Sequence, residues 1–361
     1  NIVVDYSDNT PSGWSPSVFR DLGAYFDGAN NGTVGDVDIR HSGVTGVRSA
    51  SSGTITIQNN IYSTNSSTGL GIYMEGSGTI KVGKIELPGA SIGIHQTDGI
   101  SQINQIVADN LGIGAKVSGG TSNSNAITAK AGSVGADVSG TGIVKVGNLW
   151  VNHTGGKGAR INSTNASLKV INHLGVEHDS LGVELAAGTL DLSSATSQID
   201  SGSTGVVQGG GTSYLGNMTV TDGTGVVRTA GTISSGTITL EGNAKGVQSA
   251  GAIDGELASG LTIQGASVYG NKTGISASAA ITNRSTINIG YGVNRGISGT
   301  DITNYGSITL TQSEGGSVGI YGTGNIDNNN NVSVIKRFSG DSNLSGIFSS
   351  AGSASTSNGT V

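Results

Sequence analysis

Residues 296–318 have the sequence GISGTDITNYGSITLTQSEGGSV, and this stretch of 23 residues holds the pattern that decides the fold. It begins with Gly296 followed by the branched apolar Ile297, and the same pair returns at Gly319. Between the two glycines lie two more short alternations of apolar and polar residues, around residues 302 and 308–310. Alternation with a period of two is typical of β-strands, so each such stretch should contain three short strands.

A glycine followed by Val, Ile or Ala recurs along most of the chain. The thirteen intervals between successive copies run from 20 to 28 residues and average about 23. A repeat of this length indicates a stacked repeat fold, in which each copy buries its apolar residues against its neighbours. The glycines of the fourteen copies are Gly46, Gly71, Gly93, Gly114, Gly135, Gly158, Gly182, Gly205, Gly225, Gly246, Gly274, Gly296, Gly319 and Gly346.

Three short strands in about 23 residues correspond to one coil of a three-sided β-helix. A leucine-rich repeat of similar length needs a regular Leu and Asn signature that this chain lacks, and a propeller blade needs about 40 residues. We therefore expect an all-β fold, a right-handed parallel β-helix (β-solenoid) of about fourteen coils. The handedness is taken from the general preference of parallel crossover connections.

The residue after each repeated glycine should point into the core, because its size is balanced by the residue two positions later. Where the first residue is Ile275, Ile297 or Ile320, the later one is Ala or Gly. Such compensation is expected in a narrow, close-packed core and not in a disordered chain. Three consecutive repeats show the opposite order, small then large: Ala115 with Val117, Ala136 with Val138, and Ala159 with Ile161.

The composition suits a long, thin core. Gly makes up 63 of the 361 residues, and only 12% are charged and 4% aromatic. Because there is no cysteine, disulfides, thiolate metal sites and cysteine nucleophiles are excluded. The net charge of -6 provides no basic field for nucleic acid, and no apolar run approaches the ~18 residues of a membrane span. We therefore expect no nucleic-acid partner and no membrane span.

The two ends of the chain differ from the repeats, which predicts an N-terminal cap or docking segment at residues 1–40 and β-helix repeats at residues 41–361. The first segment holds five of the fifteen aromatic residues and two of the three prolines. After Gly346 no polar or aromatic cluster closes the last coil, so we expect either more chain or another molecule at that end. The aromatic candidates for capping or docking are Trp14, Phe19, Tyr25 and Phe26.

Two phrases in the C-terminal part resemble a known family. The first is residues 281–289 (ITNRSTINI) followed by residues 295–297 (RGI), and the second is residues 302–310 (ITNYGSITL) followed by residues 318–321 (VGIY). This phrasing resembles the passenger domains of Gram-negative autotransporters, pertactin-like β-helix adhesins in particular. The resemblance covers residues 44–361 and is a pattern of repeats, not a catalytic fingerprint.

The resemblance implies a processed, secreted chain at the bacterial cell surface, with roles in adhesion, self-association or biofilm formation. It implies the chain itself as a partner, side by side or end to end, and a host or cell-surface glycan or protein as another. No cofactor is expected. Two alternatives remain open: an extracellular fibre or surface-layer subunit that stacks end to end through a contact that need not close, and a carbohydrate-active β-helix lyase or hydrolase.

An outward-facing column is predicted two residues after each repeated glycine, and it continues to Tyr321 and Phe348 near the C-terminus. The charges of four successive members alternate in sign, so we expect these four to form a ladder of cross-strand ion pairs. They are Lys116, Asp137, Arg160 and Glu184. The column is our candidate ligand-binding or self-association stripe, and its alternative role is purely structural. The candidate residues are Arg48, Tyr73, His95, Lys116, Asp137, Arg160 and Glu184.

Other polar groups do not predict a metal or catalytic centre. His153, His173 and His178 lie near Glu177 and Asp179, but their spacing matches no metal-ligand motif, so we expect no metal site. The enzyme alternative would need carboxylates on neighbouring coils. The pairs available for it are Asp98 with Asp109 and Asp191 with Asp200.

Overall fold

The structure is a computed structural model, and it is a parallel β-solenoid of about 12 turns. Its contacts divide the chain into two units, residues 1–175 with 180–189 and residues 176–179 with 190–361, which are considered one at a time. None of the described residues forms a membrane-spanning helix. The described residues are 2–4, 22–29, 31–40, 43–63, 69–89, 91–235, 238–242, 244–249, 272–277, 281–283, 287–313, 315–336, 344–350 and 352–356.

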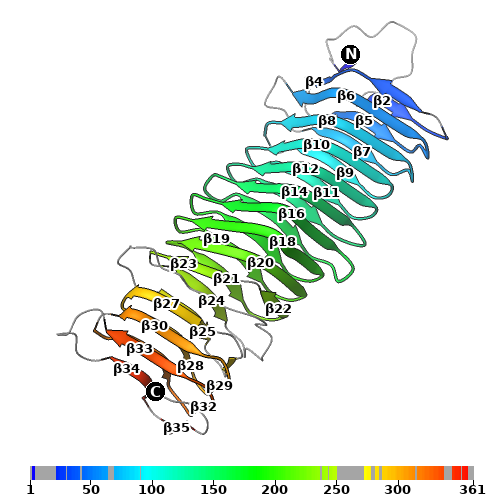
Figure 1. Cartoon of the computed structure of the whole chain (residues 1–361). Helices are drawn as coiled ribbons and strands as arrows, with labels where there is room; N and C mark the ends of the chain where they lie inside the picture. Colours follow the sequence, from blue (N-terminus) through cyan, green and yellow to red (C-terminus); the bar gives the residue numbers. More distant parts are fainter. Residues whose placement is uncertain are drawn as a thin grey trace, which may run out of the picture. The chain divides into compact units, whose positions relative to one another are not determined.

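In unit 1 a typical coil contributes one short strand and one long strand, and equivalent strands of successive coils pair in parallel (Figure 1). The short strands are β2 (Leu22–Phe26), β5 (Thr45–Ser49), β7 (Leu70–Met74), β9 (Ile92–Gln96), β11 (Ile113–Val117), β13 (Val134–Val138), β15 (Lys157–Ile161) and β17 (Leu181–Leu185). The other sheet contains β1 (Ile2–Val4), β3 (Gly32–Val34), β4 (Val37–Ile39), β6 (Thr54–Ser63), β8 (Thr79–Leu87), β10 (Ile100–Ala108), β12 (Thr121–Ala129), β14 (Ile143–Val151) and β16 (Ser167–Val176).

The repeated glycine is required by the close approach of neighbouring coils. A Cβ atom on Gly114 would lie 2.5 Å from the carbonyl oxygen of Gly135 in the next coil and 2.9 Å from the Ile106 side chain. The same overlap with a neighbouring glycine carbonyl recurs at Gly93 and Gly158. The period seen in the sequence therefore marks the place where two backbones are too close for any side chain.

The residues predicted to compensate in size do line the core of unit 1. Ala115, Ala136 and Ala159 occupy equivalent positions in successive strands, and all three are fully buried. Val117 and Val138 are buried beside them in the same strands. The strand register therefore agrees with the register inferred from the glycine spacing.

The prediction of three short strands in every coil needs correction in unit 1. From β6 onward the second and third strands join into one strand of nine or more residues, because pairing continues on both sides of a bend. In β10 and β12, for example, Ile103 pairs with Ser124 before the bend and Gln105 pairs with Ala126 after it. The bend is thus formed within a continuous strand and not by a loop.

Unit 2 begins with the same two-strand coil and changes to three separate strands toward the C-terminus (Figure 1). Its first sheet contains β18 (Thr189–Asp200), β20 (Thr212–Thr221), β22 (Thr232–Ser235) and β23 (Ile238–Glu241). The second contains β19 (Thr204–Gln208), β21 (Thr224–Arg228), β24 (Lys245–Ser249), β25 (Lys272–Ala277), β28 (Asn294–Gly299), β31 (Val318–Gly322) and β34 (Ser345–Ser349). Two smaller sheets contain β26 (Ile281–Asn283), β29 (Ile302–Asn304), β32 (Ile326–Asn328) and β35 (Ala354–Thr356), and β27 (Ile287–Gly292), β30 (Ile308–Ser313) and β33 (Val332–Lys336).

A ladder of buried asparagines explains the extra turn in the coils of unit 2. The side-chain amide of Asn283 donates to Asn304, and that of Asn304 donates to Asn328, each at 2.7 Å. The Asn304 amide also donates to the carbonyl oxygen of Gly306, 2.7 Å away, which holds the chain in a turn after β29. All three asparagines are at most 1% exposed. The asparagine of the family-like phrase is therefore a structural residue.

The number of turns is slightly smaller than expected. We expected about fourteen coils by counting repeated glycines, and the solenoid has about 12 turns. The glycine count also includes coils whose other strands lie outside the described residues, such as the coil that begins with β24.

Parallel stacking already begins within the segment that we assigned to the cap. In this segment β2 pairs with β5 and β4 pairs with β6, in the same way as the later coils. Residues 22–39 therefore contribute strands to the solenoid. Of the capping candidates, Trp14 and Phe19 lie outside the described residues.

Gly114→Ala should lower the free energy of unfolding by about 2–3 kcal/mol, because the new methyl group would overlap a backbone carbonyl that cannot move alone. Gly155→Ala is the control: this site is open, but its φ of 74° should cost about 1 kcal/mol in a non-glycine residue. Urea unfolding of both variants measures the difference, and an equal loss would contradict the role of the close approach.

Asn304→Ala should lower the free energy of unfolding by about 1–3 kcal/mol, because it leaves buried amide groups of the ladder without their hydrogen bonds. Thr303→Ala on the same strand, at a partly exposed position outside the ladder, should change it by less than about 0.5 kcal/mol. Thermal unfolding monitored by circular dichroism compares the two. A neutral Asn304→Ala would show that the ladder does not stabilise the coils.

Candidate functional site

The predicted stripe forms one continuous column on the outside of the short-strand sheet of unit 1. The strand register places each of its seven residues directly beside the next. Tyr25, predicted as a capping residue, pairs with Arg48 and extends the column by one strand. We call this set the stacked column: Tyr25, Arg48, Tyr73, His95, Lys116, Asp137, Arg160 and Glu184.

The N-terminal half of the stacked column is held by contacts between rings and a guanidinium. The Arg48 guanidinium lies 5.7 Å from the ring centre of Tyr25 and 5.6 Å from that of Tyr73, within the range of cation–π attraction. Arg48 also pairs with Glu75 at 2.8 Å. The rings of Tyr73 and His95 lie 5.3 Å apart. This half therefore presents a row of rings and a guanidinium that contact one another.

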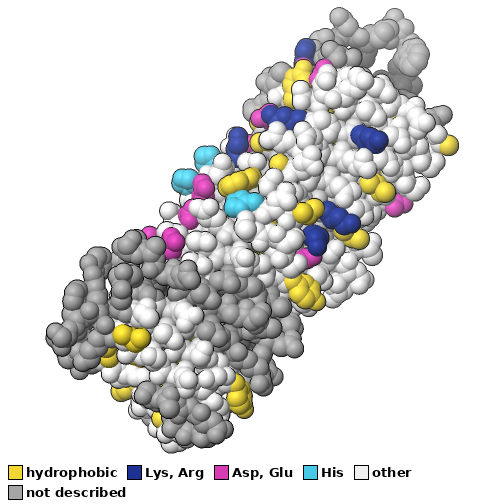
Figure 2. All heavy atoms as spheres, viewed as in Figure 1, with side chains coloured by type: hydrophobic (Ala, Val, Ile, Leu, Met, Phe, Trp, Pro, Cys, Tyr) yellow, Lys and Arg dark blue, Asp and Glu magenta, His cyan; other side chains and the backbone are white. Residues whose placement is uncertain are grey.

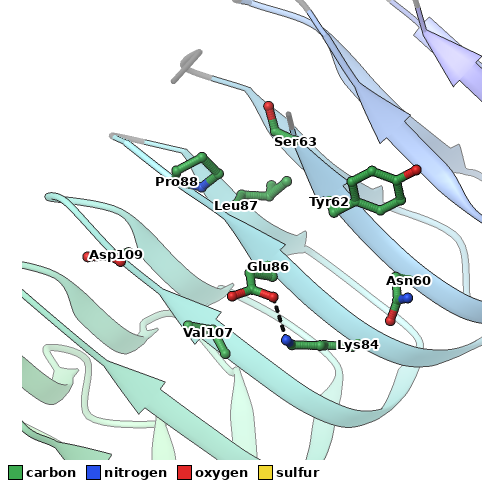
Figure 3. Close-up of a pocket in the computed structure, with 9 residues that line it drawn as sticks. All are labelled: Asn60, Tyr62, Ser63, Lys84, Glu86, Leu87, Pro88, Val107 and Asp109. Carbon is green, nitrogen blue, oxygen red and sulfur yellow. Dashed lines mark hydrogen bonds and ion pairs between the residues drawn. The ribbon is translucent and has the colours of Figure 1, made fainter. Parts of the chain in front are cut away.

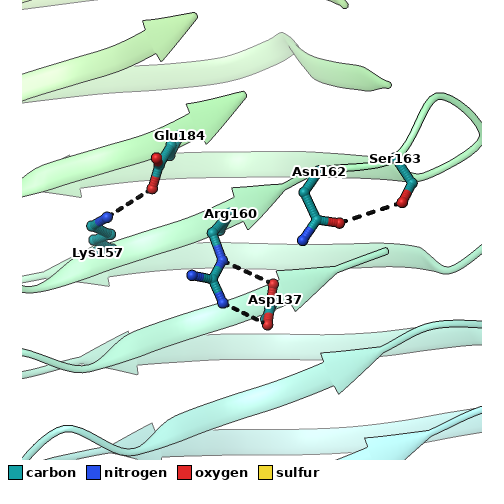
Figure 4. A network of polar contacts seen from close by, with 6 residues as sticks. All are labelled: Asp137, Lys157, Arg160, Asn162, Ser163 and Glu184. Carbon is teal, nitrogen blue, oxygen red and sulfur yellow. Dashed lines mark hydrogen bonds and ion pairs between the residues drawn. The ribbon is translucent and has the colours of Figure 1, made fainter. Parts of the chain in front are cut away.

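The C-terminal half contains ion pairs, but not the full ladder that we expected (Figure 4). Arg160 donates two hydrogen bonds to Asp137, at 3.1 and 2.8 Å, and covers it so well that Asp137 is only 7% exposed. Glu184, expected to pair with Arg160, instead accepts a hydrogen bond from Lys157 at 2.7 Å. The reason is geometric. The Arg160 guanidinium already donates to Asp137, and the Lys157 side chain reaches Glu184 from the preceding strand.

Two hollows lie on the long-strand sheet of unit 1. The smaller, of about 430 Å³, is lined by Tyr62, the neighbouring Lys84 and Glu86, and Asp109, among others (Figure 3). Its charges are already balanced, since Lys84 pairs with Glu86, and Asp109 lies 3.8 Å from Lys130. This hollow therefore offers little net charge to a ligand.

The larger hollow is an open groove of about 660 Å³ that crosses β6, β8, β10, β12, β14 and β16. We call it the polar groove, and neither Asp nor Glu is among its lining residues. On the face drawn in Figure 2, basic and acidic side chains form small groups on a largely neutral surface. The charged and amide side chains of the polar groove are Gln58, Lys81, Gln102, Asn104, Asn123, Asn125, Lys145 and Asn172.

The sequence carries a signal for the polar groove that the period of the repeated glycines does not reveal. The tripeptide Lys-Val-Gly occurs at residues 81–83 and again at residues 145–147, at equivalent positions of two coils. Both lysines lie in the groove. The tripeptide stands outside the glycine period because its glycines lie at the bend of the long strands, whereas the counted glycines lie in the short strands.

The remaining predicted groups are not brought together. Asp98 and Asp109 flank opposite ends of β10, and Asp191 and Asp200 lie nine residues apart in β18. His173 lies against Trp150 with ring centres 4.5 Å apart, and His178 lies 3.7 Å from Glu177. Among the described residues, no three His, Asp or Glu side chains are placed to hold a metal ion.

In unit 2 the last two residues of the column are also aromatic. Tyr321 and Phe348 are paired in register, with ring centres 5.5 Å apart and planes inclined by 11°. The guanidinium of Arg295 lies 4.8 Å from the Tyr321 ring centre. Stacking of rings and a guanidinium is thus a feature of both units.

Comparison with known proteins gives no relative. No family model, curated protein or solved structure matches the chain.

Protonation of His95 should destabilise unit 1. Burial lowers the pKa of His95 from its ordinary value of 6.5, and the charge of Lys116 lowers it further. As the pH falls through 6.5, the unfolded chain therefore takes up a proton before the folded chain does, and stability decreases until the pH reaches the folded pKa.

The expected result is that the wild-type protein loses more stability than His95→Gln between about pH 7.5 and about pH 5. Denaturant unfolding at several pH values measures this, and NMR titration of the His95 ring gives its pKa directly. Identical pH dependence of the two proteins, or a ring that titrates above 6.5, would contradict the prediction.

Proposed function

We propose that this chain is a non-catalytic extracellular adhesin, a passenger-type β-solenoid displayed at a bacterial surface. The observation that carries the proposal is the stacked column of unit 1. It aligns outward-facing side chains over eight successive strands, from Tyr25 in β2 to Glu184 in β17. An extended row of this kind suits contact with another large surface.

The chemistry of the stacked column supports contact through rings and charges. Exposed Tyr and Arg are the residues that most often dominate protein interfaces. Tyr25 is 46% exposed, and the Arg48 side chain is 45% exposed although it is held by Glu75 and two rings. Because these side chains are already ordered by their neighbours, little conformational entropy is lost when a partner binds.

The autotransporter assignment rests on the repeat phrasing and on the fold class. Unit 2 carries the family-like phrases on β26 to β31, where their apolar residues line the core and their asparagines form the buried ladder. In this proposal the repeats build a scaffold, and adhesion or self-association comes from residues that face outward.

The double variant Tyr73→Ala/His95→Ala tests the stacked column. We expect beads coated with this variant to adhere to cells, and to clump with one another, at least about fivefold less than beads coated with the wild-type protein. The reason is that the variant lacks two adjacent rings at the middle of the contact surface. Tyr214→Ala is the matched control, an aromatic 46% exposed on the long-strand sheet of unit 2 and outside the stacked column.

Both proteins should first be shown to unfold at the wild-type temperature. If wild-type beads neither adhere to cells nor clump, the adhesin proposal is wrong. If wild-type beads adhere and the double variant adheres equally well, the stacked column is not the adhesive surface.

A further inference from the structure

The polar groove has a regular arrangement along four consecutive coils. One row of outward side chains consists of Lys81, Gln102, Asn123 and Lys145, which are paired in register on β8, β10, β12 and β14. Parallel strands lie ~4.8 Å apart, so the backbone positions that carry the two lysines lie ~14 Å apart along the groove. The row therefore has a cation at each end and two amides between them.

A second row runs along the bend of the same strands, with Gly83, Asn104, Asn125 and Gly147 at equivalent positions. The Asn125 amide donates to Asn104 at 2.9 Å, so these two side chains lie together in the middle of the row. At Gly147 a Cβ would lie 2.5 Å from the Asn125 carbonyl oxygen, and Gly83 meets a carbonyl oxygen of its neighbouring coil in the same way. The floor therefore lacks side chains beside each lysine.

The two lysines differ from most other cations of unit 1. Within the described residues, neither the Lys81 nor the Lys145 side chain makes an ion pair or a hydrogen bond, and both residues are exposed. By contrast, six cations of this unit are paired with carboxylates: Arg40, Arg48, Lys84, Lys130, Lys157 and Arg160. In a chain with a net charge of -6, the groove is a local site of unbalanced positive charge.

The amides supply hydrogen bonds of both kinds. Gln58 and Gln102 are exposed, and their side-chain amides make no hydrogen bond to any described residue. Each amide offers two donor hydrogens and an acceptor oxygen, which match the hydroxyl groups of a sugar. The groove extends over six strands, ~24 Å at the usual strand spacing, and it is open along its length.

We propose that the polar groove binds an extended acidic polysaccharide, with Lys81 and Lys145 holding two carboxylate or sulfate groups and the amides between them holding sugar hydroxyls. The groove is too long and too open for a compact metabolite to fill. Single-stranded nucleic acid is disfavoured because its bases need aromatic platforms, and no aromatic residue is among those that line the groove. The inference deepens the proposed function and rests on it, since an adhesin would meet such polymers outside the cell.

The test uses the purified full chain and isothermal titration calorimetry at low ionic strength. Chondroitin sulfate is the sulfated probe, polygalacturonate is the carboxylate probe, and uncharged dextran is the neutral probe. We expect binding of at least one acidic polymer, no binding of dextran, and weaker binding as NaCl is added. Lys81→Gln/Lys145→Gln should lower the affinity on the order of tenfold.

Lys130→Gln/Lys245→Gln is the charge-matched control, because it removes two lysines outside the groove and leaves the same net charge. Its affinity should equal that of the wild-type protein. Asn104→Ala/Asn125→Ala should also weaken binding but leave its salt dependence unchanged, since it removes uncharged contacts only. Circular dichroism confirms that each variant keeps the wild-type content of β-structure.

Four results would overturn the proposal. The first two are that no acidic polysaccharide binds, and that dextran binds as well as the acidic polymers. The third is that the groove variant and the control variant lose affinity equally, and the fourth is that polyglutamate, a polyanion without sugars, binds as tightly as the polysaccharides. A change in sedimentation of the Lys81→Gln/Lys145→Gln variant with unchanged polysaccharide binding would also overturn it and would mark the groove as a contact between copies. Failure of the adhesin proposal is seen separately: wild-type beads then fail to adhere or clump while the purified chain still binds the polymer.

Discussion

The close approach of glycine backbones between neighbouring coils is the constraint on which the rest of the structure depends. At Gly114 the next coil leaves room for a hydrogen atom but not for a methyl group. Because this contact recurs once per coil, it sets the register of the short strands. The register in turn decides which side chains face inward, and Ala115 with Val117 are therefore buried while Lys116 between them is not.

Stacking of the coils in register has opposite consequences for side chains in the core and for side chains on the surface. Inside, identical polar residues can satisfy one another, and the ladder through Asn304 does so with a turn held at Gly306. Outside, the same stacking brings unlike residues together in rows. The stacked column combines rings, a guanidinium and ion pairs, and the polar groove combines amides with two unpaired lysines. Surfaces of this kind suit extended partners, because each coil contributes only one or two side chains.

The stacked column and the polar groove differ in how many of their charged side chains are already paired. In the stacked column Arg160 is bound by Asp137, and Glu184 is bound by Lys157, so the surface is ordered and nearly neutral. In the polar groove Lys81 and Lys145 have no carboxylate among the lining residues. The first arrangement favours contact through shape and rings, and the second favours attraction of a polyanion. Unit 1 thus carries two surfaces with distinct chemistry on its two sheets.

The sequence by itself determined the fold class, the repeat length, the inward positions and the order of the stacked column, because a steric contact repeated once per coil leaves a period that can be counted. It did not determine that Glu184 would pair with Lys157, or that two strands of most coils in unit 1 would join across a bend. It also did not reveal the polar groove. These features depend on side-chain reach and on where the chain bends, and only the tertiary structure brings Lys81 and Lys145 into one row, from residues 64 positions apart in the sequence.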